Sequence, residues 1–314
     1  MKKYLTLFLT VVLFAGLTAC TKNDVSEKNG VENKDKPFTI NYLGQEYSFD
    51  KKAENIVLAS LEGMEDAATL GVEAKGVLEV AGKVPKYLEE NFKSATLVGD
   101  KMNPNSEVIL GLNPNVIIGS SKFGEEVMNK LNKIAVTLPY SHISANWKDN
   151  LLALGEIMGK TDVANKLISD YEEKASKTKE ELSSEYKDKD ILVIRIRRGL
   201  MYVYPADVYL NPVLYTDLGI KVPGIITNSK AQAELTIETL AEINPDAIFL
   251  QFDNSENTDS PEALNQLLEN PIFKSIEASK NNKVFVNTVD PLAQGGTAWS
   301  KVRFLDAVVD NLLK

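Results

Sequence analysis

The sequence has very few of the side chains on which most metal sites and hydrolases depend. Its 314 residues include one cysteine and one histidine. A single cysteine excludes an intramolecular disulfide framework and any cysteine-rich zinc site. A single histidine leaves little scope for a histidine-rich metal site or for Ser-His catalytic machinery. Much enzyme chemistry is therefore disfavoured before any motif is considered.

Positive charge is also scarce, and arginine most of all. Lys plus Arg number 35 against 44 Asp plus Glu, which gives a formal net charge of -9 and a pI near 5.0. This acidic balance argues against a nucleic-acid partner, whose binding protein would carry a basic surface. Only four residues are arginines, and three of them are Arg195, Arg197 and Arg198. The length suggests about two domains, each large enough to bury its own core.

The N-terminus has the form of an export signal. Two lysines precede a mostly apolar run over residues 4–16, which is shorter than the ~20 residues of a membrane-spanning helix. Leu-Thr-Ala before Cys20 resembles a bacterial lipobox, so we expect a signal peptide over residues 1–19 and a lipid on Cys20. An ordinary secretory signal with a chance cysteine is the alternative. Residues 20–36 are mainly Lys, Asp, Glu and Asn, which predicts a solvated tether.

The body of the chain predicts an α/β fold with two similar lobes. Short apolar runs at residues 56–59 and 116–119 alternate with helical segments, as in a small α/β unit. Apolar residues then recur at helical spacing from Trp147 toward Tyr186, which predicts one long helix, or a broken one, of roughly 35 residues against a mean near 12. A second α/β unit begins at Ile191. We therefore predict an N-terminal lobe over 37–145, a bridging helix over 146–186 and a C-terminal lobe over 187–314, with a ligand cleft between the lobes.

An internal echo supports the two-lobe interpretation. Glu107 stands seven residues before the proline of an Asn-Pro pair that leads into an apolar run, and Glu238 stands in the same relation to a second such pair. A helix followed by Asn-Pro and a strand is a common connector, so this repeat alone is moderate evidence for two similar lobes. Together with the long helical segment between the copies, it implies two lobes built on one pattern.

At this point the chain resembles the ABC-transporter substrate-binding proteins of the helical-spine type, in their ferric-siderophore branch. The similar segments are ENIVLASLEGMEDAATLGVEAKGV, ATLVGDKMNPNSEVILGLNPNVIIGSS, WKDNLLALGEIMGK and VIRIRRGLMYVYPADVYLNPVLYTDLGIKVP. The resemblance covers essentially the whole mature chain. It implies an exported, lipid-anchored monomer on the outer face of the cytoplasmic membrane, which delivers its ligand to a permease dimer and its ATPase. It also implies that Glu107 and Glu238 dock onto permease arginines, although both would serve equally as solvated helix-start carboxylates.

The arginine cluster suggests the chemistry of the ligand. In an extended segment Arg195 and Arg197 point to one face and Arg198 to the other, and Arg198-Gly199 has the form of a turn before a returning strand. Guanidinium groups form bidentate hydrogen bonds with carboxylates and other oxyanions. We therefore expect all three arginines to bind an anionic ligand. A solvated hairpin at a sheet edge is the alternative.

Further candidate ligand residues flank the predicted cleft. Aromatic groups with a polar tip suit a bulky chelate, although core packing is an equal alternative at each: Tyr202, Tyr209, Tyr215 and Trp299. Other candidates follow predicted strand ends in the first lobe, where clefts of α/β units form: Ser60, Lys83, Lys101 and Lys122. Arg303 either faces the cleft or packs beside it. The resembling family often has arginine near Lys122, so lysine here weakens any claim to a closely similar ligand.

The absences narrow the choice of ligand. His142 alone cannot supply a bare metal site, and its position reads as a connector. A ferric siderophore needs no protein ligand to iron, so we expect no cofactor and no catalytic residue. Citrate-based carboxylate or hydroxamate chelates best suit paired arginines, whereas triscatecholates would require a spread of basic side chains. Haem with a tyrosine ligand, cobalamin, and an exported hydrolase acting on a chelate remain the alternatives, the last without a Gly-x-Ser-x-Gly elbow.

Overall fold

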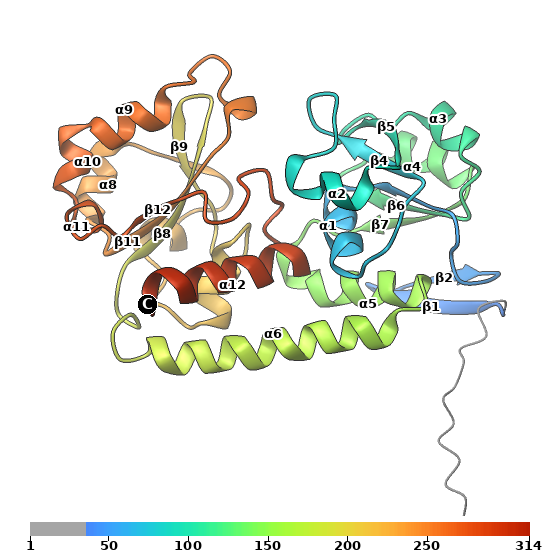
Figure 1. Cartoon of the computed structure of the whole chain (residues 1–314), viewed down its shortest axis with the longest axis horizontal. Helices are drawn as coiled ribbons and strands as arrows, with labels where there is room; N and C mark the ends of the chain where they lie inside the picture. The colour runs from blue at the N-terminus through green and yellow to red at the C-terminus, as the bar shows by residue number, and fades with distance from the viewer. Residues whose placement is uncertain (1–35) are drawn as a thin grey trace, which may run out of the picture. The chain divides into compact units, whose positions relative to one another are not determined.

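The computed structural model describes residues 36–314, which form one compact unit (Figure 1). The expected signal peptide, Cys20 and nearly all of the expected tether lie outside the described residues. Within the described part of the chain, no helix combines the length and the apolar character needed to cross a membrane.

The first lobe is built on an all-parallel sheet in the order β5-β4-β3-β6-β7. Its strands are β3 (Ile56–Ala59), β4 (Gly76–Glu79), β5 (Thr96–Asp100), β6 (Val116–Ser120) and β7 (Val136–Tyr140). Its helices are α1 (Leu61–Thr69), η1 (Lys86–Leu88), α2 (Glu89–Phe92), α3 (Ser106–Gly111) and α4 (Glu125–Asn132). Every residue of β3 and β6 is buried. Central strands covered on both faces read as unbroken apolar runs, and for this reason both were predictable.

A small antiparallel hairpin precedes this sheet. It consists of β1 (Phe38–Tyr42) and β2 (Gln45–Phe49), and β1 packs against α5 (Trp147–Ile157). The Tyr42 hydroxyl donates to Asn150 Oδ1 at 2.6 Å and accepts from the Ser141 backbone N–H at 2.7 Å. The hairpin is thereby fixed to the end of β7 and to α5.

The second lobe has a mixed sheet in the order β10-β9-β8-β11-β12. Its strands are β8 (Ile191–Arg197), β9 (Leu200–Val203), β10 (Ala233–Leu235), β11 (Ala247–Phe252) and β12 (Val284–Val286). Strands β8, β11 and β12 run parallel, whereas β9 is antiparallel to both of its neighbours. Its helical segments are the π-helix η3 (Val213–Asp217), α7 (Gly224–Thr227), α8 (Ile237–Ile243), η4 (Asn254–Glu256), α9 (Ala263–Glu269), α10 (Pro271–Ser275) and α11 (Glu277–Lys280).

The structure confirms the internal echo. Helix α3 leads into β6, and helix α8 leads into β11; these two strands lie next to β3 and β8 in their respective sheets. An asparagine with a left-handed backbone follows each helix: Asn113 lies two residues after α3, Asn244 lies directly after α8, and both have φ 48°. Asparagine tolerates this conformation better than most residues because its short polar side chain bonds locally. The two lobes therefore repeat one connector in detail.

Three helices link the lobes. Helix α6 (Thr161–Leu182) runs along both lobes in Figure 1 and packs against α5 and α12 (Ala298–Leu312). The bridging segment predicted over 146–186 thus contains two helices, with the short turn η2 (Ser144–Asn146) before them. The break occurs because Gly159 adopts a left-handed φ of 64° after α5, which ends that helix in the way glycine commonly does.

Two neighbouring carboxylates of α1 hold the N-terminus of α12. Glu65 accepts hydrogen bonds from the Thr297 hydroxyl at 2.5 Å and the Ser300 hydroxyl at 2.7 Å. Asp66 accepts from the Ala298 backbone N–H at 2.9 Å. Burial raises the pKa of Asp66 to about 8, against hydrogen bonds that lower it, and burial also raises the pKa of Glu65. The first lobe is therefore joined to α12 through fully buried acidic side chains.

Candidate functional site

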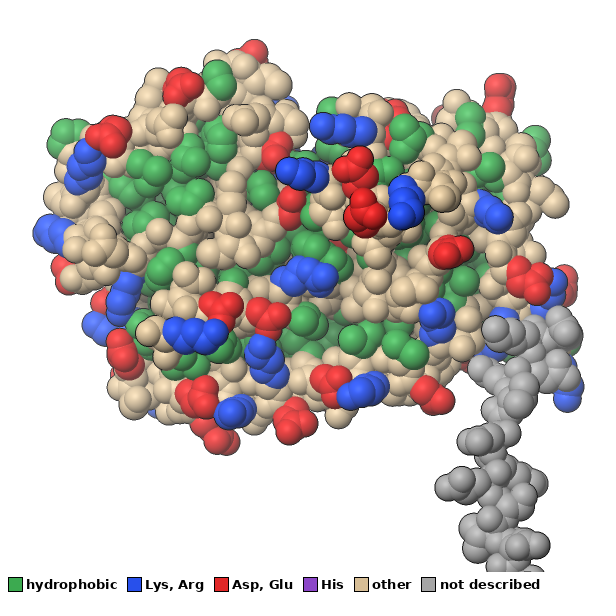
Figure 2. All heavy atoms as spheres, in the orientation of Figure 1, with side chains coloured by type: hydrophobic (Ala, Val, Ile, Leu, Met, Phe, Trp, Pro, Cys, Tyr) green, Lys and Arg blue, Asp and Glu red, His purple; other side chains and the backbone are tan. Residues whose placement is uncertain are grey.

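A cavity of about 670 Å³ lies between the two lobes. Figure 2 shows charged side chains of both signs around the notch between the lobes. Five lining residues are basic and come from both sides: Lys101, Lys122, Arg195, Arg197 and Arg198. Three lining residues are acidic: Glu62, Glu256 and Asp259. The cavity therefore has a net excess of positive charge within an otherwise acidic chain, and this excess favours an anionic ligand.

The arginines reach the cavity on a tight hairpin. Strand β8 ends at Arg197, and the chain reverses through Arg198 and Gly199, whose φ values are 52° and 77°. Two consecutive left-handed residues form the turn that joins twisted antiparallel strands. The predicted hairpin is confirmed, and all three arginines line the cavity although Arg198 was expected on the opposite face. The turn explains the difference, because its backbone no longer alternates as a strand does.

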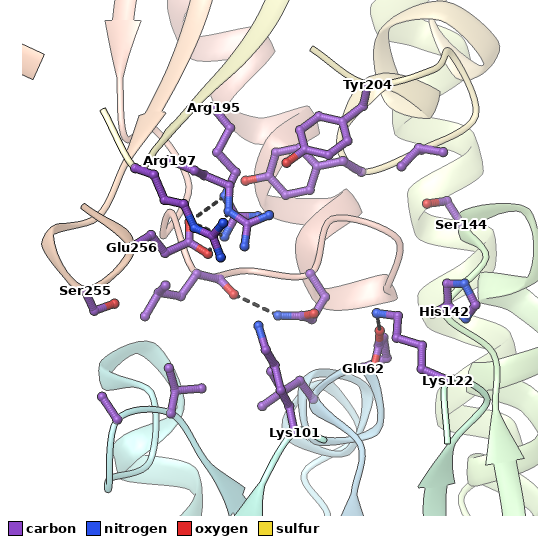
Figure 3. Close-up of a pocket in the computed structure, with 18 of the residues that line it drawn as sticks. Glu62, Lys101, Lys122, His142, Ser144, Arg195, Arg197, Tyr204, Ser255 and Glu256 are labelled. Atoms are coloured by element: carbon purple, nitrogen blue, oxygen red, sulfur yellow. Dashed lines mark hydrogen bonds and ion pairs between the residues drawn. The ribbon is translucent and has the colours of Figure 1, made fainter. Parts of the chain in front are cut away.

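Each guanidinium of the arginine pair is held by partners of its own lobe. Arg195 Nε and Nη2 lie 2.9 and 2.8 Å from Glu256 Oε2, and Arg197 Nε lies 3.3 Å from Glu256 Oε1 (Figure 3). Arg197 Nη1 donates to Gln232 Oε1 at 3.1 Å. The side chain of Arg195 is only 13% exposed, so its charge is poorly screened by water. The pair is thus oriented before any ligand arrives.

Aromatic side chains form one wall beside Arg195. The Arg195 guanidinium lies 5.2 Å from the ring centroid of Tyr209, and Tyr204 packs against that ring at 5.4 Å. Burial by itself would lower the pKa of Arg195, but the charges of Tyr209 and Glu256 raise it overall. Tyr209 has a left-handed φ of 60°, and its buried hydroxyl has no hydrogen-bond partner among the described residues. This strained residue lines the cavity, as predicted, and offers a donor to a ligand.

The first lobe contributes lysines from the loops after its strands. Lys101 follows β5 and points into the cavity from the side opposite the arginines (Figure 3). Lys122 follows β6, and its Nζ lies 2.9 Å from Glu62 Oε1. Ser60 is buried, caps α1 by accepting from the Gly63 N–H, and donates to Glu62 Oε2 at 2.9 Å. Lys101 and Lys122 line the cavity as predicted, whereas Ser60 acts behind Glu62 and does not line it.

His142 has a different position from the one expected. It lines the cavity rather than serving only as a connector, and its Nδ1 lies 2.8 Å from the Ser121 hydroxyl. Partial burial, with the charge of Lys122, lowers its pKa and favours the neutral ring. Its sequence neighbour Ser141 instead accepts hydrogen bonds from the Ile143 N–H and Asn146 Nδ2. The adjacent Ser141 and His142 therefore form no catalytic pair.

The remaining predicted ligand residues lie outside the cavity lining. The buried Tyr215 hydroxyl donates to the Ile191 carbonyl at 2.7 Å inside the second lobe. Trp299 is also buried, packing on Tyr87 at 4.7 Å, and the Arg303 guanidinium stacks on its other side at 3.9 Å. Tyr202 pairs with Arg195 in the β8–β9 ladder, and Lys83 is exposed on the loop after β4. Internal packing accounts for Tyr215, Trp299 and Arg303, and loop position accounts for Lys83, whereas the structure gives no reason for the place of Tyr202.

Several cavity residues gave no sequence signal that we recognised. Glu62 and Glu256 are two of 44 acidic residues, and each pairs with cations that lie about 60 positions away in the chain. Tyr204 stands in the quoted arginine segment, directly after β9, where no local pattern distinguishes it from Tyr202. Within residues 36–314 no cluster of three or more His, Cys, Asp or Glu side chains is arranged to hold a metal ion.

The two echoed glutamates occupy equivalent exposed positions away from the cavity. Glu107 lies in the first turn of α3, and Glu238 lies in the first turn of α8. Neither forms an ion pair within the described chain at contact distance, so both carboxylates face solvent beside a helix N-terminus. A partner with two basic groups would find one carboxylate on each lobe.

Comparisons with known proteins agree with this architecture. The iron-uptake system-binding protein of Bacillus subtilis (strain 168) is 43% identical over 316 residues, covering 99% of each chain. The crystal structure of the triscatecholate siderophore binding protein FeuA from Bacillus subtilis, complexed with ferri-bacillibactin, superposes with a TM-score of 0.81 at 45% identity, covering 88% of this chain and 98% of that one. The probable siderophore-binding lipoprotein YfiY of Bacillus subtilis (strain 168) is 26% identical over 292 residues, covering 90% of this chain and 89% of its own.

The family assignment follows from a match over most of the folded body. The family model for periplasmic binding proteins matches residues 56–290, from the first strand of the parallel sheet to the segment after β12. Members of such a family bind solutes outside the cytoplasm and are not enzymes. The chain belongs to the periplasmic binding protein family, as an exported solute-binding protein with two α/β lobes.

Proposed function

We propose that this chain binds a ferric siderophore in the cavity between its lobes and delivers it to an ABC permease and its ATPase. The observation that carries the proposal is the placement of five basic side chains, from both lobes, around one cavity of about 670 Å³. A compact anionic chelate would meet positive charge on opposite sides, and its iron would need no protein ligand. The similarity to iron-uptake and siderophore-binding proteins supports the same conclusion.

The arrangement favours a triscatecholate over the carboxylate or hydroxamate chelates expected from the sequence. Three catecholate dianions around one ferric ion leave a trianion whose charge is spread over its whole surface. Lysines on one side and arginines on the other match such a distribution, since Lys101 lies across the cavity from Arg195 and Arg197 (Figure 3). A single carboxylate group would need only the arginine pair. The related FeuA, which binds ferri-bacillibactin, is a triscatecholate-binding protein.

The test is a titration of the purified protein with ferri-bacillibactin, ferric citrate, a ferric trihydroxamate, haem and cobalamin. Binding is followed by calorimetry and by quenching of the buried Trp147 and Trp299. We expect saturable, submicromolar binding of ferri-bacillibactin, with weaker binding of the other ligands. Tighter binding of citrate or the trihydroxamate would overturn the chelate class. Binding of haem or cobalamin alone would overturn the siderophore function.

Permease docking through Glu107 and Glu238 is part of the same proposal. Both carboxylates are exposed at equivalent sites of the two lobes, so replacing them should leave the cavity unchanged. We expect Glu107→Ala combined with Glu238→Ala to abolish iron uptake in cells while the affinity for the chelate stays the same. Exposed Glu125 on α4 provides a matched control, and Glu125→Ala should leave uptake normal. Normal uptake by the double variant would overturn the docking role.

The anchoring proposal concerns the N-terminal segment. A diacylglycerol on Cys20, with residues 20–36 as a polar tether, would hold the monomer near its permease on the outer face of the membrane. Metabolic labelling with palmitate tests it, with Cys20→Ala as the control. Label in the parent chain and none in the variant supports the anchor.

A further inference from the structure

Of the three acidic side chains that line the cavity, Glu256 contacts both members of the arginine pair. Glu256 lies on η4, directly after β11, and its side chain is only 15% exposed. Its two oxygens contact both Arg195 and Arg197 at 2.8 to 3.3 Å. A carboxylate beside the arginines repels an anionic ligand. A cavity selected only for the highest affinity for an anion would therefore not contain it. The position of Glu256 therefore calls for a role of its own.

The backbone around Glu256 is fixed to the arginine hairpin. The Arg198 N–H donates to the Glu256 carbonyl at 2.9 Å, and the Gly199 N–H donates to Asn257 Oδ1 at 3.0 Å. Buried Asn257 also donates from Nδ2 to the Ile196 carbonyl at 3.0 Å. These bonds tie the loop to β8 on both sides of the turn. Hydrogen bonds therefore hold Glu256 and the arginine hairpin to each other within the second lobe.

The contacts leave specific donors available to a ligand. Glu256 contacts Nε and Nη2 of Arg195 and Nε of Arg197. Gln232 accepts a hydrogen bond from Nη1 of Arg197. Within the described chain, Nη1 of Arg195 and Nη2 of Arg197 have no hydrogen-bond partner. Figure 3 shows both guanidinium groups extending past Glu256 toward the cavity. The carboxylate thus holds the arginines from behind while their outer N–H groups remain free.

The same contact changes the charge that a ligand experiences. Two guanidinium groups and one carboxylate offer a single net positive charge, where the arginines alone would offer two. Because Coulomb energy scales with the product of the charges, this reduction acts three times more strongly on a trianion than on a monoanion. The low exposure of the group limits screening by water and salt. Glu256 therefore weakens the attraction for highly charged chelates while it orients the arginines.

We propose that Glu256 limits the affinity of the cavity for trianionic chelates by offsetting the charge of the arginine pair. The inference rests on the proposed function, because it assumes a ferric chelate in this cavity. Gln232 allows the opposite change of charge to be tested. Its neutral amide already accepts from Arg197, and it accepts from the Tyr204 hydroxyl at 3.1 Å. A charge removed at Glu256 and a charge added at Gln232 should shift affinity in opposite directions.

The test compares Glu256→Gln and Gln232→Glu with the parent chain, using ferri-bacillibactin as the probe. Glutamine keeps an oxygen that can accept from the arginines but removes the negative charge. We expect Glu256→Gln to lower Kd about tenfold and to steepen the dependence of Kd on salt, and Gln232→Glu to raise Kd by a smaller factor, because Gln232 is exposed and its charge would be screened. If Glu256 acted only as a structural support, Glu256→Gln would raise Kd and leave the dependence of Kd on salt unaltered.

The outcomes separate this inference from the function on which it rests. Parent protein that binds ferri-bacillibactin, with a Glu256→Gln variant that binds it equally or more weakly, would overturn the inference and leave the function standing. Parent protein that binds no ferric chelate would remove the function, and the inference with it. Thermal unfolding of both variants identifies any that fail to fold, and Glu256→Asp, which keeps the charge, should retain a Kd close to that of the parent.

Discussion

The two lobes supply positive charge to the same cavity by different means. In the first lobe, Lys101 and Lys122 stand on exposed loops after parallel strands. In the second lobe, Arg195 and Arg197 belong to a strand of the sheet and are clamped by Glu256. A lysine is a compact charge on a flexible stem, whereas a guanidinium held at its Nε edge presents its remaining N–H groups in a fixed direction. The first lobe therefore offers adaptable charge at Lys101 beside a Lys122 that is paired with Glu62, and the second lobe offers oriented charge.

Strand topology explains this difference. After β3 the chain forms α1 and crosses over to the parallel β4, so the end of β3 presents a helix N-terminus with Glu62. After β8 the chain turns back at once as the antiparallel β9, so the equivalent place presents arginines on a hairpin. The neighbouring strands β6 and β11 keep the same relation to these two in both sheets. A single change of connection thus converts a helix-terminus site into an arginine site.

The largest expected effect comes from removing the charges of one lobe at a time. We expect Arg195→Gln with Arg197→Gln to weaken binding of ferri-bacillibactin at least about 100-fold, and Lys101→Gln with Lys122→Gln about tenfold. The arginine pair is oriented and partly desolvated, whereas the lysines are exposed and more strongly screened. Calorimetric titration of both double variants at one salt concentration measures the difference.

Part of the arginine effect should come from the carboxylate left behind. Without its two partners, Glu256 would face the trianion with its charge uncompensated. Adding Glu256→Gln to the arginine variant should therefore recover some affinity. Equal losses in the arginine and lysine variants would contradict the distinction between oriented and adaptable charge.

A second prediction tests how the lobes are joined. Asp66 contacts α12 from α1, and burial raises its pKa to about 8 from its ordinary value of 3.8. Between pH 3.8 and about pH 8 the Asp66 carboxyl is protonated in the folded protein and ionised in the unfolded protein. The stability that Asp66 contributes is therefore present in acid and is lost as the pH rises toward 8. We expect this loss to be about 1.4 kcal/mol per pH unit between pH 5 and pH 7.

Asp66→Asn isolates this contribution, because an amide has no ionisation in that range. The free energy of unfolding in urea, measured at several pH values, should fall with rising pH more steeply in the parent than in the variant. The charge of Glu65 raises the pKa of Asp66, so the two titrations are coupled and the difference in slope reports the pair. A variant with the same pH slope as the parent would show that Asp66 is ionised in the folded protein.

The sequence predicted those features that depend on short stretches of chain. The buried strands at 56–59 and 116–119, the turn at Arg198 and the repeated Asn-Pro connector each follow from local pattern, and the structure confirms them. The arginine cluster was conspicuous because arginine is so rare in this chain. Local pattern was therefore enough to find the arginine hairpin of the second lobe.

The remaining features depend on contacts between distant parts of the chain. Glu256 meets Arg195 across 61 positions, and His142 meets Ser121 across 21, because neighbouring parallel strands bring their ends together. Tyr215 lies close to the arginines in sequence, yet its hydroxyl is committed to the Ile191 carbonyl in the core. Acidic and aromatic residues are too numerous for composition to single out the few that line the cavity. Only the order of the strands distinguishes them.

The smallest expected effect compares the repeated connector in the two lobes. Asn113 and Asn244 share a φ of 48°, which costs ~1 kcal/mol or more for a residue such as alanine. Asn244 in addition accepts from the Glu277 N–H at 2.8 Å, a bond worth about 1 kcal/mol. We expect Asn113→Ala to cost about 1 kcal/mol of unfolding free energy and Asn244→Ala about 2 kcal/mol.

Glycine variants separate the backbone cost from the hydrogen bond. Glycine adopts a left-handed φ without strain, so Asn113→Gly should be nearly neutral, while Asn244→Gly should cost only the hydrogen bond, about 1 kcal/mol. The Asn244 variant should then lose more unfolding free energy than the Asn113 variant by the same amount in the alanine pair and in the glycine pair, because the backbone cost is the same at both sites. If these two differences in unfolding free energy were unequal, the backbones of the two connectors would be strained to different extents despite their equal φ.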